Sequence, residues 1–388
     1  MKNKGHNGSF GSLLLLVKTK GSKFYFLPYF RKMILDLIPA LSKSYSILEN
    51  QTLRVNPLGE GLIHETLLVE NGTDRWVLQG FNEAVFNFPE RIDHNLSLLS
   101  RHAKTHPLPF LLPLPILNNS GNGLTEIQGK KYRLFDFVKG TTLQQINDPN
   151  QAYMAALAYG EFATWGKDVS GDEMQETIPN FHRLDLRFEK LILAAEDKNS
   201  LSEEEIEVLD FYLSQEHLVD WYLTQLDRLP LRVTHNDTKI NNLIFSENLK
   251  KVDALIDLDT LMGGFLMYDF GDLARTVACS LPETSTQWDA IHQIPELFEE
   301  LLKGYWEGVG EFATAEEAKS VLFGGEIMTL IMGLRFYTDH LQGNIYYRVT
   351  YPEQNFHRAK NQMIFLQSQQ ENRELLRNTW EKVTGLQL

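Results

Sequence analysis

Apolar and polar residues follow a strand-like pattern between about residues 50 and 140. Short runs of Val, Ile, Leu and aromatic residues are separated there by Gly and Asn turn signals, which predicts strands. The segment TLRVNPLGEGLIHETLLVENGTDRWVLQGF predicts three strands, with a turn at Asn71-Gly72 between the last two. A hairpin with a tight turn near Gly129 is expected in GLTEIQGKKYRLFDFVKG, ending in an apolar strand over 132–138.

Helical spacing appears once within this region and dominates after about residue 150. In ERIDHNLSLLSRHAK the apolar residues Ile92, Leu96 and Leu99 recur at helical intervals. The exception in the later part of the chain is 231–260, where short β-rich runs interrupt the helices. Long helices are predicted over 151–168, 202–226, 286–308, 314–341 and 354–384.

This change of pattern predicts an α+β fold of two lobes. We expect a small β-rich N-lobe over 33–137 and a larger, mainly helical C-lobe over 138–388. A connector near 135–140 would join them and leave a cleft, and lobe junctions are favoured places for ligands.

Residues 1–32 have no steady period and are expected to be an N-terminal extension. Their apolar run at 13–17 is too short for the core of a signal peptide, and Lys18 and Lys20 follow it at once. Met33 opens MILDLIPALSKSYSI, in which Ile34, Leu37 and Leu41 have helical spacing. We therefore hypothesise that the native chain starts at Met33 and that the earlier residues are a disordered arm or an upstream translation.

Composition and charge narrow the classes of partner. The net charge is −14, from 37 basic and 51 acidic residues, whereas a nucleic-acid-binding protein is expected to carry a basic face. A polyanion such as ATP stays compatible, because a bound divalent metal reverses the local field. The single cysteine has no partner for an internal disulfide, and no apolar run approaches the ~20 residues of a membrane span. We expect a cytoplasmic protein that binds small molecules and needs no nucleic acid, membrane or obligate protein partner.

The segment LRVTHNDTKINNLIFSENLKKVDALIDLDT, at 231–260, carries the most specific chemistry. Phosphoryl transfer needs a carboxylate that orients and deprotonates the acceptor, hard oxygen ligands for Mg²⁺, and a cation near the moving phosphoryl group. Asp237, Lys239 and Asn242 provide these groups, and Asp257 follows on an apolar strand. We predict Asp237 as the base, Lys239 as the γ-phosphate partner, and Asn242 with Asp257 as metal ligands.

The neighbouring polar residues have plainer interpretations as well. Asp and Asn are common in turns, so each half of the segment taken alone would read as a polar turn. His235 is expected to hold the loop, and Asp259 is either a second metal ligand or a strand cap. Of Asp269 and Asp272, one is expected to cap the helix that follows, and Asp269 is also a candidate for holding the catalytic loop in place.

Six motifs, in order over roughly residues 45–375, resemble the N-acetylhexosamine 1-kinase family. That family lies within the aminoglycoside phosphotransferase and choline kinase superfamily. The motifs are GEGLIHET at 59–66, WVLQ at 76–79, THNDTKINN at 234–242, IDLDT at 256–260, DFGD at 269–272 and RFYTDHLQGNIYY at 335–347.

The resemblance implies a bilobal protein-kinase-like fold with ATP and Mg²⁺ as cofactors, and it assigns site residues. Asp237 would accept the proton of the anomeric hydroxyl, and Arg335 with Tyr346 would hold the amino sugar. Adenine would lie against backbone groups of the connector, between Phe135 and Val138. The candidate nucleotide-binding residues are Gly59, Gly61, His64, Thr66, Gln79, Phe135 and Phe137.

Four positions depart from kinase patterns or have two interpretations. His64 replaces the usual Asn of the Gly-rich loop and is expected either to bond a phosphate or to be exposed. Asn344 replaces an acidic residue of the family, which affects the expected sugar selectivity. Gln79 stands where protein kinases have a lysine, and the family that this chain resembles also has a glutamine there. A neutral amide, however, cannot neutralise phosphate charge. Arg335 would either bind the sugar or pair with Asp339, four residues further along the same helix.

The sequence thus predicts a kinase that phosphorylates the anomeric hydroxyl of a free N-acetylhexosamine. A kinase of the same fold acting on choline, an aminoglycoside or homoserine is the alternative within enzymes. A non-catalytic nucleotide-binding pseudokinase is the alternative from another class, although no base or metal ligand is missing.

Overall fold

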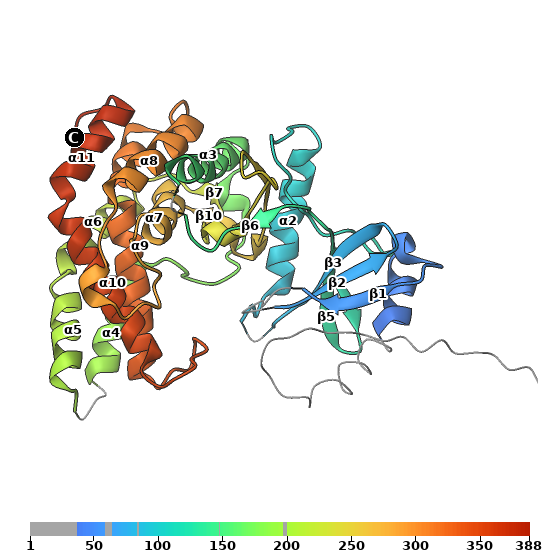
Figure 1. Ribbon diagram of the computed structural model, residues 1–388, viewed down its shortest axis with the longest axis horizontal. Coiled ribbons are helices and arrows are strands. Elements are labelled where there is room, and N and C mark those ends of the chain that lie inside the picture. The colour runs from blue at the N-terminus through green and yellow to red at the C-terminus, as the bar shows by residue number, and fades with distance from the viewer. Residues whose placement is uncertain (1–36, 59–63, 84, 147, 197–199) are drawn as a thin grey trace, which may run out of the picture.

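A computed structural model describes residues 37–388, except 59–63, 84, 147 and 197–199. Figure 1 shows a small sheet-bearing part on one side and a larger helical part on the other. We call these the N-lobe and the C-lobe. The predicted two-lobed α+β fold is confirmed. The proposed start at Met33, the extension 1–32, and Gly59 and Gly61 lie outside the described residues.

The N-lobe is built on one antiparallel sheet with strand order β1-β2-β3-β5-β4. The turn between β4 and β5 places Gln128 and Gly129 at positive φ, as a tight hairpin requires, so that hairpin prediction is confirmed. The strands are β1 (Arg54–Pro57), β2 (Glu65–Asn71), β3 (Asp74–Gly80), β4 (Thr125–Ile127) and β5 (Lys130–Asp136).

The two faces of this sheet have different tasks, because side chains alternate along a strand. One face packs into a separate core with the helical residues 37–44; Trp76, Leu78, Tyr132 and Leu134 are buried in it. The intervening positions, among them Gln79 and Arg133, must therefore point to the other face.

Helix α2 (Pro89–Ala103) joins the two lobes. Its buried residues Ile92, Leu96 and Leu99 belong to the main apolar core of the C-lobe rather than to the core of the sheet. The side chain of Asn95 donates hydrogen bonds to the carbonyls of Gln175 and Leu261, in the C-lobe. In Figure 1 this helix stands between the sheet and the larger helical part.

The C-lobe consists mainly of helices, and α9 forms its centre. Helix α9 contains many fully buried residues and packs against α7, α10 and α4. It is the one helix among the described residues long and apolar enough to cross a membrane, but 78% of its most apolar window is buried in the protein, which marks it as a core helix. The helices are α3 (Pro149–Trp165), α4 (Leu184–Glu196), α5 (Glu203–Leu213), α6 (Glu216–Leu226), α7 (Leu266–Val277), α8 (Pro295–Val309), α9 (Ala315–Leu341), α10 (Gln354–Glu371) and α11 (Arg373–Thr384).

The predicted long helices are partly confirmed. The prediction over 314–341 matches α9, whose N-terminus is closed by a capping box between Thr314 and Glu317. The predictions over 202–226 and 354–384 each span two helices, which break at residues 214–215 and at Asn372. The apolar period continues through both breaks, so it does not reveal them.

Short strands and turns fill 231–264 and carry the polar motifs. Strand β7 (Arg232–Thr234) pairs with β10 (Met262–Gly264), and β8 (Leu243–Phe245) pairs with β6 (Thr141–Thr142) and β9 (Val252–Leu255). Single-turn helices η4 (Ile240–Asn242) and η5 (Leu258–Thr260) connect them. The loop between β7 and η4 is thereby held against the turn that follows β9.

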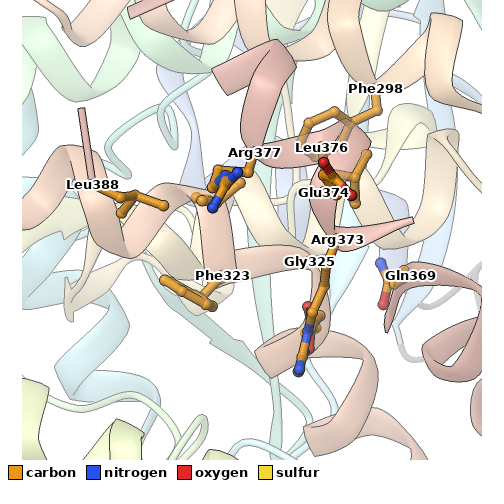
Figure 2. A pocket seen from close by; sticks show the side chains of 11 residues that line it. Phe298, Phe323, Gly325, Gln369, Arg373, Glu374, Leu376, Arg377 and Leu388 are labelled. Carbon is orange, nitrogen blue, oxygen red and sulfur yellow. Dashed lines mark hydrogen bonds and ion pairs between the residues drawn. The ribbon is translucent and has the colours of Figure 1, made fainter. Parts of the chain in front are cut away.

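A cavity of about 340 Å³ lies within the C-lobe among α8, α9, α10 and α11 (Figure 2). The ion pair between Arg373 and Glu326 lies beside it, with a distance of 2.8 Å between Arg373 Nε and Glu326 Oε1. None of its lining residues belongs to the candidate site described next.

Candidate active site

The loop at 235–239 is anchored by one buried carboxylate of α7. Asp269 accepts hydrogen bonds from the backbone N–H groups of His235 (2.9 Å) and Asn236 (2.7 Å). The hydroxyl of Thr238 donates to the Asp269 carbonyl at 2.6 Å. Asp269 thus holds the loop, as one sequence interpretation proposed. The expected helix cap is wrong, because α7 begins at Leu266 after Phe265 and has no side-chain cap.

His235 and Asn236 fix the path of the loop from within. His235 is fully buried and bonds through Nε2 to the Ile256 carbonyl, so it has the expected structural role. Asn236 adopts a left-handed backbone conformation (φ 62°), and its side chain donates to the carbonyls of Thr234 and Thr260. The next residue, Asp237, is therefore presented from a rigid turn.

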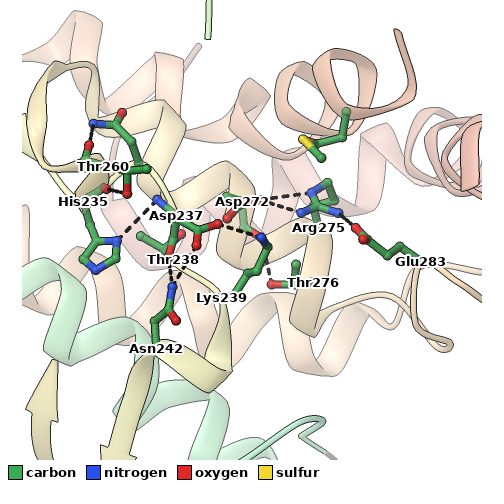
Figure 3. A network of polar contacts seen from close by, with 12 residues as sticks. His235, Asp237, Thr238, Lys239, Asn242, Thr260, Asp272, Arg275, Thr276 and Glu283 are labelled. Atoms are coloured by element: carbon green, nitrogen blue, oxygen red, sulfur yellow. Dashed lines mark hydrogen bonds and ion pairs between the residues drawn. The ribbon is translucent and has the colours of Figure 1, made fainter. Parts of the chain in front are cut away.

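The carboxylate of Asp237 lies between the side chains of Lys239 and Asn242 (Figure 3). Its Oδ1 is 2.7 Å from Lys239 Nζ, and its Oδ2 accepts from Asn242 Nδ2 at 2.9 Å. Asn242 also donates to the Asp237 carbonyl at 2.8 Å. Three of the residues predicted from HNDTKINN are thus brought together in direct contact.

The electrostatics of this group keep Asp237 ionised. Burial acts to raise the pKa of Asp237, but the positive charge and hydrogen bond of Lys239, with the bond from Asn242, lower it to about 2. The pKa of Lys239 lies above its usual range, because the attraction of Asp237 outweighs the effect of burial. At neutral pH the pair is a carboxylate and an ammonium.

A second ion-pair network lies beside Lys239. Arg275 is almost fully buried and pairs with Asp272 (2.8 Å) and with Glu283 (2.8 Å), as Figure 3 shows. The negative charges of Asp272 and Glu283 also act on Lys239 and favour its charged form. Asp272 is therefore part of this network and not the expected helix cap.

Asn242 and Asp257 have the chemistry of a magnesium site. The amide nitrogen of Asn242 donates hydrogen bonds, whereas its amide oxygen has no hydrogen-bond partner in the described part of the chain. The carboxylate of Asp257 has no hydrogen-bond partner there either. Asp257 is exposed and sits at positive φ (62°) directly after Ile256. One or two protein oxygens together with nucleotide phosphates are what Mg²⁺ typically uses, so the residues present fit the ion.

The protonation of Asp257 is set by its acidic neighbours. Limited hydration by the surrounding protein, and then the negative charges of Asp259 and Asp237, raise the pKa of Asp257 to about 7. A cation bound at this carboxylate would favour the ionised form instead.

Asp259 is engaged by the N-lobe on both of its oxygens. Arg133 donates to Asp259 Oδ2 at 2.8 Å and also to Oδ1, and His64 Nε2 lies 2.7 Å from Oδ2. Arg133 lowers the pKa of Asp259 against the effect of burial. Asp259 therefore ties the two lobes together, and His64 is buried rather than exposed.

The face of the sheet turned away from the N-lobe core presents two cross-strand rows. Thr66, Gln79 and Arg133 are register partners and form a polar row. Next to it, Leu68, Val77 and Phe135 form a row of partly exposed apolar side chains.

Of the candidate nucleotide-binding residues, Thr66, Gln79 and Phe135 share this face. Phe137 lies elsewhere: its ring is under the guanidinium of Arg75, at 4.1 Å, where it helps to line a different pocket.

Arg335 is surrounded by aromatic rings instead of an acid. Its guanidinium carbon lies 4.9 Å from the ring centre of Phe181, 5.6 Å from that of Tyr346 and 5.4 Å from that of Tyr347. The proposed ion pair with Asp339 is wrong. Within the described residues, Arg335 forms no pair with any carboxylate.

Asp339 instead organises the segment that carries the two tyrosines. It accepts from the backbone N–H groups of Tyr346 (2.7 Å) and Tyr347 (2.9 Å) and from Asn355 (2.8 Å). Asn344 adopts a left-handed conformation and donates to the Pro352 carbonyl. At this position Asn344 shapes the turn.

Several polar groups near Arg335 were missed by sequence reasoning. Buried atoms without a hydrogen-bond partner in the described part of the chain include His182 Nδ1, Arg187 Nε, Tyr347 Oη and Arg358 Nε. Burial and the charge of Arg335 lower the pKa of His182 to about 3 and that of Arg187 to about 10. No motif marked these residues. The run Phe181-His182-Arg183 just before α4 was the available signal.

His182 connects this group to the catalytic loop, because its Nε2 bonds to the Asn236 carbonyl at 3.0 Å. Its neutral ring then offers Nδ1 as an acceptor, whereas the arginines and Tyr347 offer donors. Unsatisfied buried groups of both kinds, next to Asp237, are typical of a binding site for a ligand with several polar atoms.

The family model described as "Phosphotransferase enzyme family" matches residues 54–312. A curated homoserine kinase from Methylobacillus flagellatus is 26% identical over 261 residues, which cover 66% of this chain and 74% of that protein.

Solved structures with a similar fold include an aminoglycoside phosphotransferase from Alicyclobacillus acidocaldarius. It has a TM-score of 0.58 at 14% identity and covers 88% of this chain and 95% of that one. A choline kinase from Cryptosporidium parvum has a TM-score of 0.56 at 15% identity and covers 87% and 96%. At these identities the likeness concerns the fold alone.

Proposed function

The chain belongs to the phosphotransferase enzyme family, and from this premise we propose that it is an ATP- and Mg²⁺-dependent sugar kinase. Its acceptor would be the anomeric hydroxyl of a free N-acetylhexosamine, and its product the sugar 1-phosphate. The observation that carries the proposal is the contact group of Asp237, Lys239 and Asn242, followed by Asp257.

In the proposed reaction the acceptor hydroxyl donates a hydrogen bond to Asp237, which orients its oxygen for in-line attack on the γ-phosphorus. As the new O–P bond forms and the bond to the leaving ADP breaks, the proton passes to the Asp237 carboxylate. A carboxylate with a pKa of about 2 suffices, because the loose transition state asks little of the nucleophile until late.

Lys239 and a metal held by the candidate ligands would offset the negative charge of the phosphate groups. The ammonium of Lys239, held at Asp237, is available to the transferred phosphoryl group. Asn242 and Asp257 would hold Mg²⁺, which when bound neutralises the phosphate oxygens of the nucleotide. The two rows of the sheet suit a nucleotide: the apolar row offers a surface for adenine, and the polar row lies beside it.

The surroundings of Arg335 support a sugar as the acceptor. Phe181, Tyr346 and Tyr347 offer ring surfaces, and His182 with Arg187 offers an unpaired acceptor and an unpaired donor. A neutral molecule with several hydroxyl groups and an amide would satisfy such a mixture. The motif resemblance at 335–347 supports the same class.

Homoserine is a second candidate, for one specific reason. The charge of Arg335 lowers the pKa of Arg187, and among the described residues neither arginine has a carboxylate partner. The carboxylate of an amino acid would offset one of these two positive charges, and one relative of the chain is a homoserine kinase. A purely cationic acceptor such as choline fits less well, because two arginines would repel it.

A comparison of acceptors tests the proposal. ADP release is measured with N-acetylglucosamine, N-acetylgalactosamine, their methyl glycosides, homoserine and choline, each with ATP and Mg²⁺. We expect turnover with at least one free sugar and none with the methyl glycosides, whose anomeric oxygen is blocked. Turnover with homoserine alone would replace the sugar by the second candidate. If none of these acceptors supported ADP release, both candidates would be refuted.

A further inference from the structure

In the polar row of the N-lobe sheet, the buried cation Arg133 lies beside the neutral Gln79. Gln79 on β3 and Arg133 on β5 are register partners, and Arg133 Nη2 donates to Gln79 Oε1 at 2.5 Å. A kinase-type site uses an N-lobe cation at the nucleotide phosphates, and Gln79 carries no charge. Arg133 is only 3% exposed, although a guanidinium is strongly hydrated in water.

The Asp259 carboxylate accepts hydrogen bonds from both terminal nitrogens of the Arg133 guanidinium. Of the five N–H donors of a guanidinium, two are directed at the Asp259 oxygens and one at Gln79. Two donors remain, and one of them, Nε–H, is buried without a partner in the described part of the chain. A buried donor left unpaired is unfavourable, and a phosphate oxygen is a stronger acceptor than the neutral Gln79 amide.

Arg133 is also close to the proposed metal ligand. Its positive charge acts on the carboxyl groups of Asp257 and of Asp93 in α2, lowering the pKa of each against larger opposing effects. The bonds of Arg133 to Gln79 and Asp259 place the guanidinium between the sheet and the turn that carries Asp257 and Asp259.

Other cations of the same strand are engaged at the surface. Lys130 pairs with Glu65 at 2.5 Å and Lys131 pairs with Glu83 at 2.7 Å, and all four side chains are about one-third exposed or more. Such pairs contribute little and respond to salt, unlike the buried pair of Arg133 with Asp259.

We propose that Arg133 is the phosphate-binding cation of the N-lobe, in the place of a lysine at position 79, and that Asp259 is its positioning residue rather than a metal ligand. The unpaired donors of Arg133 would contact the nucleotide phosphates while Asp259 keeps the guanidinium in place. The proposal rests on the proposed use of ATP, but not on which acceptor is phosphorylated.

Nucleotide binding to the full chain, measured by calorimetry with ADP, ATP and adenosine in the presence of Mg²⁺, tests this role. We expect R133Q to weaken ADP and ATP binding roughly ten- to a hundredfold, the loss expected for a charged hydrogen bond, and to leave adenosine binding unchanged. K131Q, which removes the same charge two residues away on the same strand, is the matched control and should bind all three like the wild type.

Two further variants keep the test decisive if R133Q leaves Asp259 without a counter-charge and unfolds. R133Q/D259N removes both charges and should show the same selective loss of ADP affinity. Q79K/R133Q/D259N returns a cation to β3 and should regain most of that affinity.

Normal ADP binding by R133Q/D259N would overturn the proposal, and so would an equal loss of adenosine and ADP binding, which indicates a structural role only. Failure of the wild type to bind any nucleotide would overturn the proposed function itself, and the role of Arg133 with it.

Discussion

Three aspartates of this site differ in their pKa because their neighbours differ. Asp237 is held as a carboxylate by Lys239 and Asn242, with a pKa near 2. Asp257 faces two other acids, which contribute to a pKa near 7. Asp259, bonded to Arg133 and His64, stays ionised. Environments that separate carboxyl groups in this way suit them to separate tasks: proposed proton acceptor, proposed metal ligand and lobe anchor.

The raised pKa of Asp257 predicts a pH dependence of metal–nucleotide binding. Only the ionised carboxylate binds a metal, so protons compete with Mg²⁺ below pH 7. We expect the affinity for ADP with Mg²⁺ to fall about tenfold from pH 8 to pH 6, as a pKa of about 7 implies. Calorimetry over this range gives the profile.

D257N is the control for this profile, because it removes the carboxyl group of Asp257 and retains every other ionisation, including that of Asp269 and of the nucleotide. The wild type should show a steeper dependence than D257N. Parallel profiles for the two proteins would exclude Asp257 as the titrating ligand.

Motif residues could be predicted from the sequence, whereas residues that act through long-range contacts could not. HNDTKINN predicted the contact group at Asp237, because its members are close in the chain. Arg133 alternates with the buried Tyr132 and Leu134 like any outward-facing strand residue. Only the sheet register and the folding of the lobes bring it to Asp259, 126 positions away.

At the scale of elements, α7 links the geometry of the candidate site to the core. Its Asp269 anchors the loop at 235–239, and its other face packs closely against α9. The close approach occurs at Gly271, where an added Cβ would overlap the carbonyl oxygen of Gly324. The position of Asp269 is therefore coupled to the packing of two helices.

Replacing Gly271 with alanine should destabilise the protein by about 1–3 kcal/mol, since rigid backbone atoms would have to move. Activity should fall as well, because Asp269 lies two residues earlier in the same helix. Chemical unfolding and ADP release measure the two effects.

Gly325→Ala is the matched control on α9. Its Cβ would meet the amide end of the Gln369 side chain at 3.0 Å and lie in ordinary contact with the Ala274 Cβ at 3.7 Å, and alanine favours a helix over glycine. Equal stability losses in G271A and G325A would argue against tight packing at Gly271.

Helix prediction succeeded for α9, and it failed where two helices continue one apolar pattern. The prediction over 286–308 also began too early, because α8 starts at Pro295. Alpha-9 was predicted to within one residue, with its capping box as a start signal. Helices α10 and α11 were predicted as one, because no Gly or Pro marks the break at Asn372. Both present apolar residues to neighbouring cores, so the period alone does not separate them.

At the scale of the whole molecule, the fold defines the chemistry more closely than it defines the acceptor. Solved structures of similar fold include an aminopropanol kinase, with a TM-score of 0.57 at 16% identity, and the choline kinase. Membership of the phosphotransferase enzyme family supports phosphoryl transfer, whereas the proposal for the acceptor rests on the surroundings of Arg335. The central claim is therefore the proposed product: a sugar phosphorylated at its anomeric oxygen.

The most direct test of this claim is the ³¹P NMR spectrum of the reaction of ATP, Mg²⁺ and a free N-acetylhexosamine with the full-length protein. We predict a new phosphate resonance coupled to the anomeric proton, formed at least about a hundredfold more slowly by D237N, which should still bind the sugar. Phosphate at another sugar oxygen, no sugar phosphate at all, or near-normal turnover by D237N would contradict the account.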